Sequence, residues 1–465
     1  MKQGMWASYF AGIKDTQHGE SYSRILRYFY PEFITSLVIF ALPFWIDSYF
    51  ISLLQSTPAY ATLGTTNNTL HFLFKIAEAF SIGTVIMVGN FNGLAEYKKA
   101  GRVFKDAFWI TVACGALFAI TLFFTAELTL TWLNASPDII ALGIPFWRLR
   151  AVGVFFTFVY LAFIGFLRGI KNTRTPMYIF VIGAAAFIFF DLGFIFGKFG
   201  LPELGFNGSA WASVIQSVVM TVAAIVLVLV NKGYRQYAIE LFSELDFHYI
   251  KELFKIIWPV AIDKATLAFA YIWLSKTINI MGTCSTASFC AIKDLERFAF
   301  LPAIAFAQVI TLLVSNDHGR RDWAGIKSNI KKVMFMASIM VFSILAVFSV
   351  YPTQLMKISD KNGDFTQLTA QIFPILSVLV FFDLIQLILS GALRGAGDVK
   401  VVMWTRLAVC IGYFIPVSSF LASLDIANPV LKFLLIYGSF YVGNGLMSIV
   451  YINRLRGSKW KAPTL

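Results

Sequence analysis

The 465-residue chain is far more apolar than a soluble protein of its size. Hydrophobic side chains make up 58% of it, and charged ones only 14%, whereas soluble domains carry about 25% charged residues. The 38 Lys and Arg against 25 Asp and Glu give a net charge of +13, without the polar, aromatic-poor composition of a disordered or nucleic-acid-binding protein. We therefore expect an integral membrane protein with no nucleic-acid partner.

Motifs for enzyme chemistry are not visible in the chain. Its four cysteines and four histidines do not form the clusters of metal sites, and neither HExxH nor GxSxG occurs. The segment GALRGAG at 391–397 lacks the Lys-Ser or Lys-Thr of a phosphate-binding loop and is interpreted as a cytoplasmic turn. We expect no enzymatic activity and no cofactor.

Twelve apolar runs are long enough to cross a bilayer as helices, because a hydrocarbon core of about 30 Å needs about 20 residues. They cover approximately residues 28–54, 68–90, 106–125, 139–165, 176–197, 209–230, 254–280, 288–314, 333–351, 366–389, 401–422 and 431–452. The second and eighth runs contain charged residues at a three-residue spacing, which lets them neutralise each other on one helix face. The predicted structural pairs are Lys75 with Glu78, Lys293 with Glu296, and Arg297 with Asp294.

Lys and Arg are concentrated on one side of these runs, as in Lys98, Lys99, Arg102 and Lys105. The loops of the opposite side contain Lys198, Lys357, Lys361 and Lys432. Because short cytoplasmic loops retain positive residues, this asymmetry places both termini in the cytoplasm. The first 27 residues are too polar for a signal-peptide core, so the first helix is expected to direct insertion.

An internal repeat appears when the chain is shifted by 226 positions. LRGIKNTRTPMY at 167–178 then meets LRGAGDVKVVMW at 393–404, and Asn90, Gly93, Glu96 and Tyr97 meet Asn316, Gly319, Asp322 and Trp323. Six helices in each half make the halves parallel and relate them by an axis along the membrane normal. The predicted fold is thus an all-α polytopic membrane protein of twelve transmembrane helices in two six-helix lobes. Its parts are a cytoplasmic N-terminal segment (1–27), an N-lobe (28–230), a cytoplasmic linker (231–253), a C-lobe (254–452) and a cytoplasmic tail (453–465).

Two parallel lobes can rock about a central cavity, and acids inside the membrane are then the candidate functional groups. Asp47 in the first run and Asp191 in the fifth have no basic residue within a turn on their own helix, which suits reversible binding of a proton or cation. The alternative for both is a hydrogen bond between helices or a structural pair between the lobes. Asp383 and Gln386 in the tenth run share a helix face suitable for a sodium ion or a proton. Asp263 is a further candidate for ion or substrate binding, and the alternative is that it or its neighbour Lys264, from which the helical geometry directs it away, anchors helix packing.

A set of motifs in a fixed order resembles the multidrug and toxin extrusion (MATE) family. It consists of a Pro sixteen residues before Asp47, NFNGLAEYKKA at 90–100, LRGIKNTRTP at 167–176, LGFNGSAWAS at 204–213, NDHGRRDWAG at 316–325 and DLIQLILSGALRGAGD at 383–398. The resemblance covers essentially residues 25–455. It implies twelve helices in two lobes and a secondary antiporter that exports organic cations or toxic compounds in exchange for protons or sodium.

The resemblance also implies roles for individual residues. Asp47 matches the acid of the family's first helix, Asp191 that of helix five in the proton-linked bacterial branch, and Asp383 the tenth-helix carboxylate of the sodium-linked branch. The chain departs from both branches, because Phe187 stands where the first usually has Asn and Leu267 where the second has Glu.

One alternative within the same superfamily is a flippase of lipid-linked sugars or another amphipathic anion, whose cavity would be basic to hold pyrophosphate. Arg148 and Arg150 within the fourth run favour that alternative, whereas twelve helices favour the antiporter. Small-molecule organic cations and membrane lipid are the expected partners. The resemblance further implies a bacterial inner membrane and a functional monomer.

Overall fold

The computed structural model describes residues 13, 15, 17–132, 137–359 and 365–462. The described part of the chain is helical and contains no strand, as the sequence predicts. Lys361 and most of the predicted N-terminal segment lie outside the described residues. The element order is α2 (Tyr22–Ala41), η1 (Leu42–Asp47), α3 (Ser48–Ser52), α4 (Thr57–Gly93), α5 (Tyr97–Phe124), α6 (Ala126–Trp132), α7 (Pro137–Gly169), α8 (Arg174–Phe196), η2 (Lys198–Gly200), α9 (Phe206–Ile225), η3 (Val226–Val230), η4 (Lys232–Tyr237), α10 (Phe247–Asn279), α11 (Thr283–Gly319), α12 (Trp323–Val350), α13 (Pro352–Ser359), α14 (Thr366–Gly395), α15 (Val399–Val409), η5 (Cys410–Phe414), α16 (Ile415–Ser423), α17 (Pro429–Arg456) and η6 (Lys459–Lys461).

All twelve predicted runs fall on long helical segments. Among the described residues, 11 of these segments are long and apolar enough to cross a membrane. The twelfth, α10, is 33 residues long but carries charged side chains along its length, including Lys251, Asp263 and Lys276. A helix suits the bilayer because it satisfies its backbone hydrogen bonds internally.

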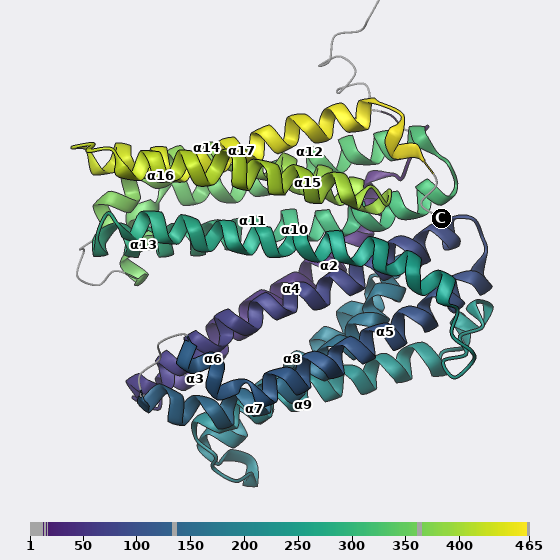
Figure 1. Ribbon diagram of the computed structural model, residues 1–465, viewed down its shortest axis with the longest axis horizontal. Coiled ribbons are helices and arrows are strands. Elements are labelled where there is room, and N and C mark those ends of the chain that lie inside the picture. Colours follow the sequence, from purple (N-terminus) through teal and green to yellow (C-terminus); the bar gives the residue numbers. More distant parts are fainter. Residues whose placement is uncertain (1–12, 14, 16, 133–136, 360–364, 463–465) are drawn as a thin grey trace, which may run out of the picture. The chain divides into compact units, whose positions relative to one another are not determined.

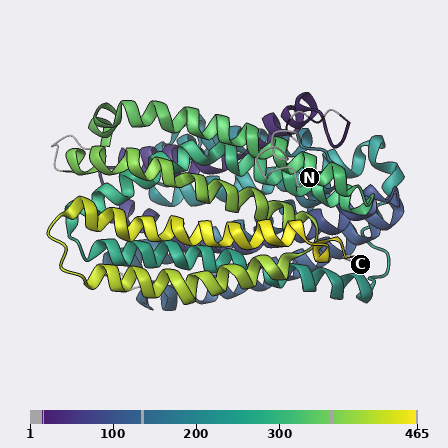
Figure 2. The same cartoon turned by 90° about the horizontal axis from the view of Figure 1, so that it is seen from above.

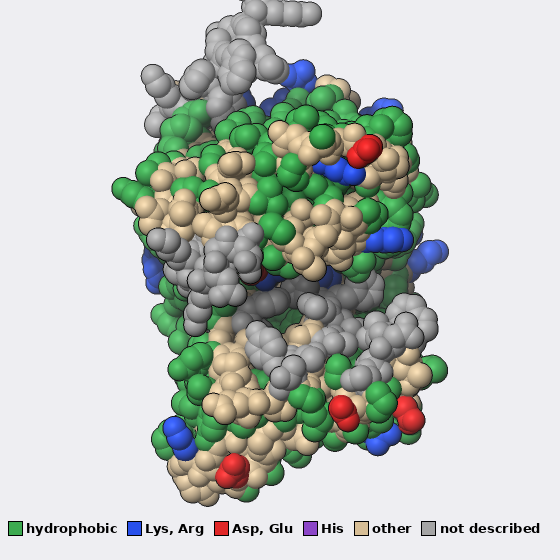
Figure 3. All heavy atoms as spheres, turned by 90° about the vertical axis from the view of Figure 1, so that its left-hand side faces the viewer, with side chains coloured by type: hydrophobic (Ala, Val, Ile, Leu, Met, Phe, Trp, Pro, Cys, Tyr) green, Lys and Arg blue, Asp and Glu red, His purple; other side chains and the backbone are tan. Residues whose placement is uncertain are grey.

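The helices group into two compact units, which we name for the half of the chain that supplies most of each. The N-unit is Tyr30–Trp258, and the C-unit is Met1–Phe29 together with Pro259–Leu465. By contacts, residues 1–29 and 453–465 group with the C-unit and residues 231–258 with the N-unit, while the predicted lobe boundaries stay predictions. Within the C-unit, α11, α12, α14 and α17 pack against one another with their axes in similar directions (Figures 1 and 2). At the end seen in Figure 3, charged side chains are scattered among larger areas of hydrophobic and other surface.

Close helix crossings in both units follow the sequence repeat. A Cβ atom on Gly165 of α7 would lie 2.7 Å from the carbonyl oxygen of Ser81 in α4. In the C-unit, a Cβ on Gly391 of α14 would lie 3.0 Å from the carbonyl oxygen of Ala307 in α11. The same offset of 226 relates Gly169, beside Val88, to Gly395, beside Val314. Small residues one turn apart thus let paired helices approach closely in both units, as is common in membranes.

Two of the repeated motifs end helices with a residue in the left-handed region. Ala95 after α4 and Arg321 after α11 both have φ of 58°, while Lys171 after α7 and Gly397 after α14 have φ of 60° and 78°. Such a residue stops the helix and lets its last carbonyl groups accept hydrogen bonds. The turn interpretation of GALRGAG holds only for its last two residues, because residues 391–395 belong to α14 and the turn begins at Ala396.

The residues just before α2 pack on the C-unit, to which they belong. The Lys332 Nζ atom of α12 donates hydrogen bonds to the carbonyl oxygens of His18 and Glu20, at 3.0 and 3.1 Å. The backbone N–H of Glu20 donates to the Asn329 side chain at 2.7 Å. Further along, the ring of Phe29 stacks on that of Phe306 with centroids 4.1 Å apart. Chain segments from both ends of the sequence thus build one unit.

Candidate functional site

Asp47 lies where the first membrane segment changes its helical winding. The α-helix α2 passes through Pro31 and gives way to the π-helical segment η1, which ends at Asp47. π-Helical turns are rare and often lie at functional sites. The Asp47 carboxylate is 1% exposed, and its Oδ1 accepts a hydrogen bond of 2.6 Å from the hydroxyl of Ser209 in α9. Its Oδ2 is buried without a hydrogen-bond partner among the described residues.

Asp191 lies in the last third of α8, which ends at Phe196, and is completely buried. Within the described residues, neither of its carboxylate oxygens has a hydrogen-bond partner. A buried polar group without a partner costs free energy, and an ionised one costs much more. The site therefore favours a proton or another positively charged ligand at Asp191.

Arg150 of α7 lies near both acids. Its guanidinium group donates to the Ser213 hydroxyl and, at 2.8 Å, to the side-chain oxygen of Asn67. The charges of Asp47, Asp191 and Arg150 act on one another. Across the described residues, neither acid forms an ion pair with Arg150 within 4.0 Å. We call Asp47, Asp191 and Arg150, with their partners Asn67, Ser209 and Ser213, the N-unit site.

The polar partners in this site were missed by sequence reasoning. Ser209 and Ser213 belong to the motif LGFNGSAWAS, which was used only to recognise the family. Their spacing of four residues places both hydroxyls on one face of α9. That spacing could have indicated a polar face directed toward the acids. Arg150 was considered only as a ligand for an anion.

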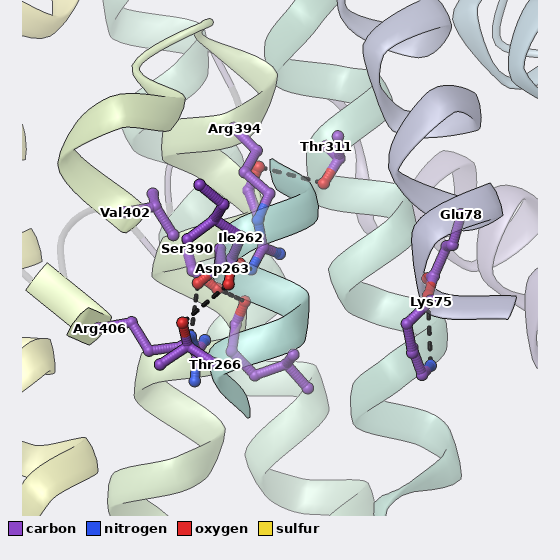
Figure 4. A network of polar contacts seen from close by, with 12 residues as sticks. Lys75, Glu78, Ile262, Asp263, Thr266, Thr311, Ser390, Arg394, Val402 and Arg406 are labelled. Carbon is purple, nitrogen blue, oxygen red and sulfur yellow. Dashed lines mark hydrogen bonds and ion pairs between the residues drawn. The ribbon is translucent and has the colours of Figure 1, made fainter. Parts of the chain in front are cut away.

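Asp263 of α10 is held by two arginines of the C-unit (Figure 4). Its Oδ2 lies 2.5 Å from the Nη2 of Arg394 at the end of α14, and its Oδ1 lies 2.5 Å from the Nε of Arg406 in α15. All three side chains are buried. This arrangement ties three helices together, and the repeat partner Arg168 makes a similar contact in the N-unit, with Glu32 at 2.7 Å.

Asp383 and Gln386 have different environments on α14. The half-buried Asp383 accepts a hydrogen bond of 3.1 Å from the side-chain amide of Asn444 in α17. Gln386 is 2% exposed, and its Nε2 atom has no hydrogen-bond partner among the described residues. Both side chains offer oxygen atoms that a sodium ion prefers.

Glu296 on α11 bonds to tyrosines instead of to its predicted partner. The hydroxyl groups of Tyr437 and Tyr441 in α17 donate to its two oxygens, the latter at 2.6 Å. Lys293 instead lies over the ring of Tyr271, 4.3 Å from its centroid. The predicted Lys293–Glu296 pair is therefore wrong, because two tyrosine hydroxyls satisfy the carboxylate and an aromatic face attracts the ammonium.

The two other predicted structural pairs are confirmed. Lys75 and Glu78 pair on α4 at 3.2 Å, as Figure 4 also shows, and Arg297 pairs with Asp294 on α11 at 3.5 Å. Both pairs have the three-residue spacing that places side chains on one helix face. They account for charges within two of the membrane segments.

Comparison with known proteins identifies the family. The MatE family model matches residues 33–192 and again residues 259–418, two segments offset by the same 226 positions as the sequence repeat. The chain belongs to the MATE family. It is thus a member of a family of multidrug efflux transporters with twelve membrane helices, and not an enzyme.

Curated relatives are distant in sequence but similar in extent. A "probable multidrug resistance protein NorM" of Agrobacterium fabrum is 24% identical over 350 residues, which cover 71% of this chain and 72% of that protein. One of the same name from Thermotoga maritima is 22% identical, with 74% of each chain covered. The "probable multidrug resistance protein YoeA" of Bacillus subtilis is 21% identical, with 70% and 72% covered.

Solved structures share the fold. An outward-facing multidrug resistance MATE transporter of the MOP superfamily superposes with a TM-score of 0.85 at 17% identity, covering 93% of this chain and 94% of that one. A MOP superfamily transporter from Pyrococcus furiosus, described as having a binding pocket of reverse polarity, gives a TM-score of 0.84 at 17% identity, with 96% of each chain covered. MATE structures therefore have the predicted fold.

A small pocket lies in the C-unit. Its lining includes Leu267 and Ala270 of α10 together with Arg406, Phe440 and Asn444. Leu267 is apolar, so a hydrocarbon side chain faces this pocket beside Arg406 and Asn444. In the described ranges, no group of three or more His, Cys, Asp or Glu residues is placed to hold a metal ion.

Proposed function

We propose that this protein is a secondary active antiporter that exports organic cations in exchange for protons. The observation that carries the proposal is Asp191, whose fully buried carboxylate has two oxygens without a hydrogen-bond partner among the described residues. Nearby, the Oδ2 atom of Asp47 is also buried without a hydrogen-bond partner among the described residues. Acids buried in a membrane protein commonly mark the pathway of an ion or substrate.

Protons and substrate compete for these carboxylates. A proton on Asp191 or Asp47 neutralises the buried charge, and an organic cation that enters the site replaces the proton. The Ser209 hydroxyl orients Asp47 through Oδ1 and leaves Oδ2 available to the ligand. Rocking of the units then exposes the occupied site to the other side of the membrane.

Sodium coupling is the second form of the same proposal. Asp383 and Gln386 supply carboxylate and amide oxygens for a sodium ion in the C-unit. Asp263 is a weaker candidate for ion binding, because two arginines already occupy its oxygens. We assign it a structural role that ties α10 to α14 and α15.

The proposed setting is a bacterial inner membrane, with both termini in the cytoplasm and the protein acting as a monomer among lipids. The distribution of Lys and Arg supports the orientation, and the bacterial sources of the curated relatives support the membrane. A flippase of lipid-linked sugars is the alternative. Its basic cavity is disfavoured because the charge of Arg150 is opposed by two acids, while Arg148 lies exposed over the ring of Phe123.

Transport in proteoliposomes tests the proposal. Efflux of ethidium is driven separately by a proton gradient and by a sodium gradient, for wild type, Asp47→Asn, Asp191→Asn and Asp383→Asn. Proton-driven efflux that is lost in the first two variants supports coupling at the N-unit site, and sodium-driven efflux lost in Asp383→Asn moves coupling to the C-unit. No efflux from folded wild type under either gradient refutes the proposal and favours an anionic, lipid-linked substrate.

A further inference from the structure

Arg150 brings a permanent positive charge to a site that also contains two acids. A guanidinium group stays protonated in proteins at any physiological pH. Ser213 and Asn67 hold its two terminal nitrogens, and the Asn67 side chain also interacts with Asp47. The arginine is thus fixed beside the acids by neutral partners, while the acids keep oxygens available.

The charges in the N-unit site can be added up from the elements that pack around it. Asp47 and Asp191 are the charged groups that act on Arg150. The neighbouring helix α9 contributes hydroxyls and has no charged residue in its sequence. On α4, Lys75 and Glu78 neutralise each other at 3.2 Å. With both acids ionised, the site therefore carries one net negative charge.

One net negative charge sets the charge of the ligand that can be bound. A single proton neutralises the site in the absence of substrate, and one monovalent cation neutralises it when the proton leaves. A divalent cation would leave one positive charge uncompensated, which is unfavourable at such depth. Without the arginine, the two acids would hold two protons and could exchange both for a divalent cation.

We propose that Arg150 is a built-in counter-charge that makes the N-unit site selective for monovalent over divalent organic cations, with one proton exchanged per cation. This inference rests on the proposed function, because it concerns the ligand of the same site. Arg150 acts here as a residue that determines specificity through charge, without itself pairing with the cation.

Ethidium and propidium are matched probes, because they share one aromatic ring system and carry one and two positive charges. Their binding to the purified full-length protein is measured by calorimetry in buffers of different ionisation enthalpy, which also gives the protons released. Wild type is expected to bind ethidium with release of one proton. It should bind propidium at least about tenfold more weakly, because a tenfold loss of affinity corresponds to less free energy than the cost of one uncompensated charge in the membrane.

Arg150→Gln is expected to raise the propidium-to-ethidium affinity ratio by about tenfold or more, with two protons released per propidium. Arg148→Gln is the matched control, because Arg148 is an exposed arginine two positions away on the same helix. It should leave both affinities unchanged. Arg150→Lys should keep the wild-type ratio, because it keeps the charge.

A second, independent test removes one acid and then compensates for its charge by removing the arginine. Asp191→Asn leaves one acid facing Arg150, so the site is already neutral and ethidium binding should fall by about tenfold or more. The double variant Asp191→Asn with Arg150→Gln restores one net negative charge and should recover ethidium binding with release of one proton. A positional role of Arg150 would not produce this recovery.

Two results would overturn the inference alone. One is an unchanged propidium-to-ethidium ratio in folded Arg150→Gln, and the other is a folded double variant that binds ethidium no better than Asp191→Asn. If Arg150→Gln does not fold, ethidium binding by Asp191→Asn at wild-type affinity would overturn it instead. Wild type that binds neither dye nor transports any cation would refute the proposed function itself, and the inference with it.

Discussion

Arg394 makes in the C-unit the contact that Arg168 makes in the N-unit. The two arginines are 226 positions apart, and each ends the fourth long helix of its half of the chain. Arg168 binds Glu32 of α2 through two nitrogens at 2.9 and 2.7 Å, and Arg394 binds Asp263 of α10 at 2.5 Å. Each half of the chain thus has a buried acid–arginine pair between its first and fourth long helices, but only the arginines are related by the repeat, because Glu32 corresponds to Trp258 and not to Asp263.

Asp263→Asn is expected to destabilise the protein by about 3–5 kcal/mol, because it leaves Arg394 and Arg406 buried without their anion. The measurement is unfolding in mixed micelles, followed by circular dichroism. Glu96→Gln is the control, since its side chain is 39% exposed and its ion pair with Lys99 lies at the start of α5, next to the turn after α4. That change should cost about 0–1 kcal/mol. Equal effects of the two variants would contradict the structural role of Asp263.

Asp191→Asn is expected to leave the free energy of unfolding unchanged or raised while it abolishes proton-driven transport. The reason is that its oxygens accept no hydrogen bond from the described residues, so an amide of the same shape breaks no such bond and avoids the cost of a buried charge. Asp47→Asn should instead weaken a charge-assisted bond from Ser209 and cost about 1.5–3 kcal/mol. Micelle unfolding and proteoliposome efflux provide the two readouts.

The control for both substitutions is Glu203→Gln, which changes an exposed acid. It should affect neither stability nor efflux. If Asp191→Asn unfolds as readily as Asp263→Asn, then Asp191 has a structural partner, and its assignment to ion binding would be withdrawn.

Gly395→Ala is expected to destabilise the C-unit by about 1–3 kcal/mol, because overpacking a close contact forces shifts of the backbone. The new Cβ would lie 2.6 Å from the carbonyl oxygen of Thr311. Gly64→Ala is the matched control in α4, where a Cβ meets nothing within 4 Å. It should be neutral or stabilising, since Ala favours helix. A thermal denaturation series in detergent distinguishes the two.

Glu296→Gln should cost about 1–3 kcal/mol, because it replaces one of the two oxygens by an NH2 group, which cannot accept the hydrogen bond of the tyrosine hydroxyl that faces it. A double-mutant cycle with Tyr441→Phe measures the coupling between the two side chains. We expect a coupling free energy of at least about 0.5 kcal/mol. Strict additivity would show that the 2.6 Å contact contributes nothing to stability.

The helices were predictable from sequence because a membrane segment must be long and apolar to satisfy both its backbone and its lipid neighbours. The helix α10 was predictable for the same reason, although its charged residues make it less apolar than the 11 candidate membrane spans among the described residues. The repeat of Arg168 and Arg394 was visible as well. Their partners were not, because the acids do not follow the 226-residue offset: the position that corresponds to Glu32 is Trp258.

Contacts between helices account for most of what the sequence did not reveal. Spacing along one helix correctly paired Lys75 with Glu78. It failed for Lys293 and Glu296, where side chains of α10 and α17 provide better partners than the neighbouring turn. Within the N-unit site, Asp47 and Asp191 were recognisable as isolated acids, but the position of Arg150 between neutral partners needed coordinates.

The chain passes between its two units inside helices, after Phe29 in α2 and before Pro259 in α10. A protein cut in the exposed segment at Phe242 would therefore yield two fragments that each retain a piece of the other's unit. The first would carry residues up to Phe29, which bond to α12, and the second would carry the start of α10, which packs against the N-unit. Neither fragment contains all the residues of its own unit, because each carries a segment that packs in the other unit. Co-expression of the two fragments should therefore restore a working transporter.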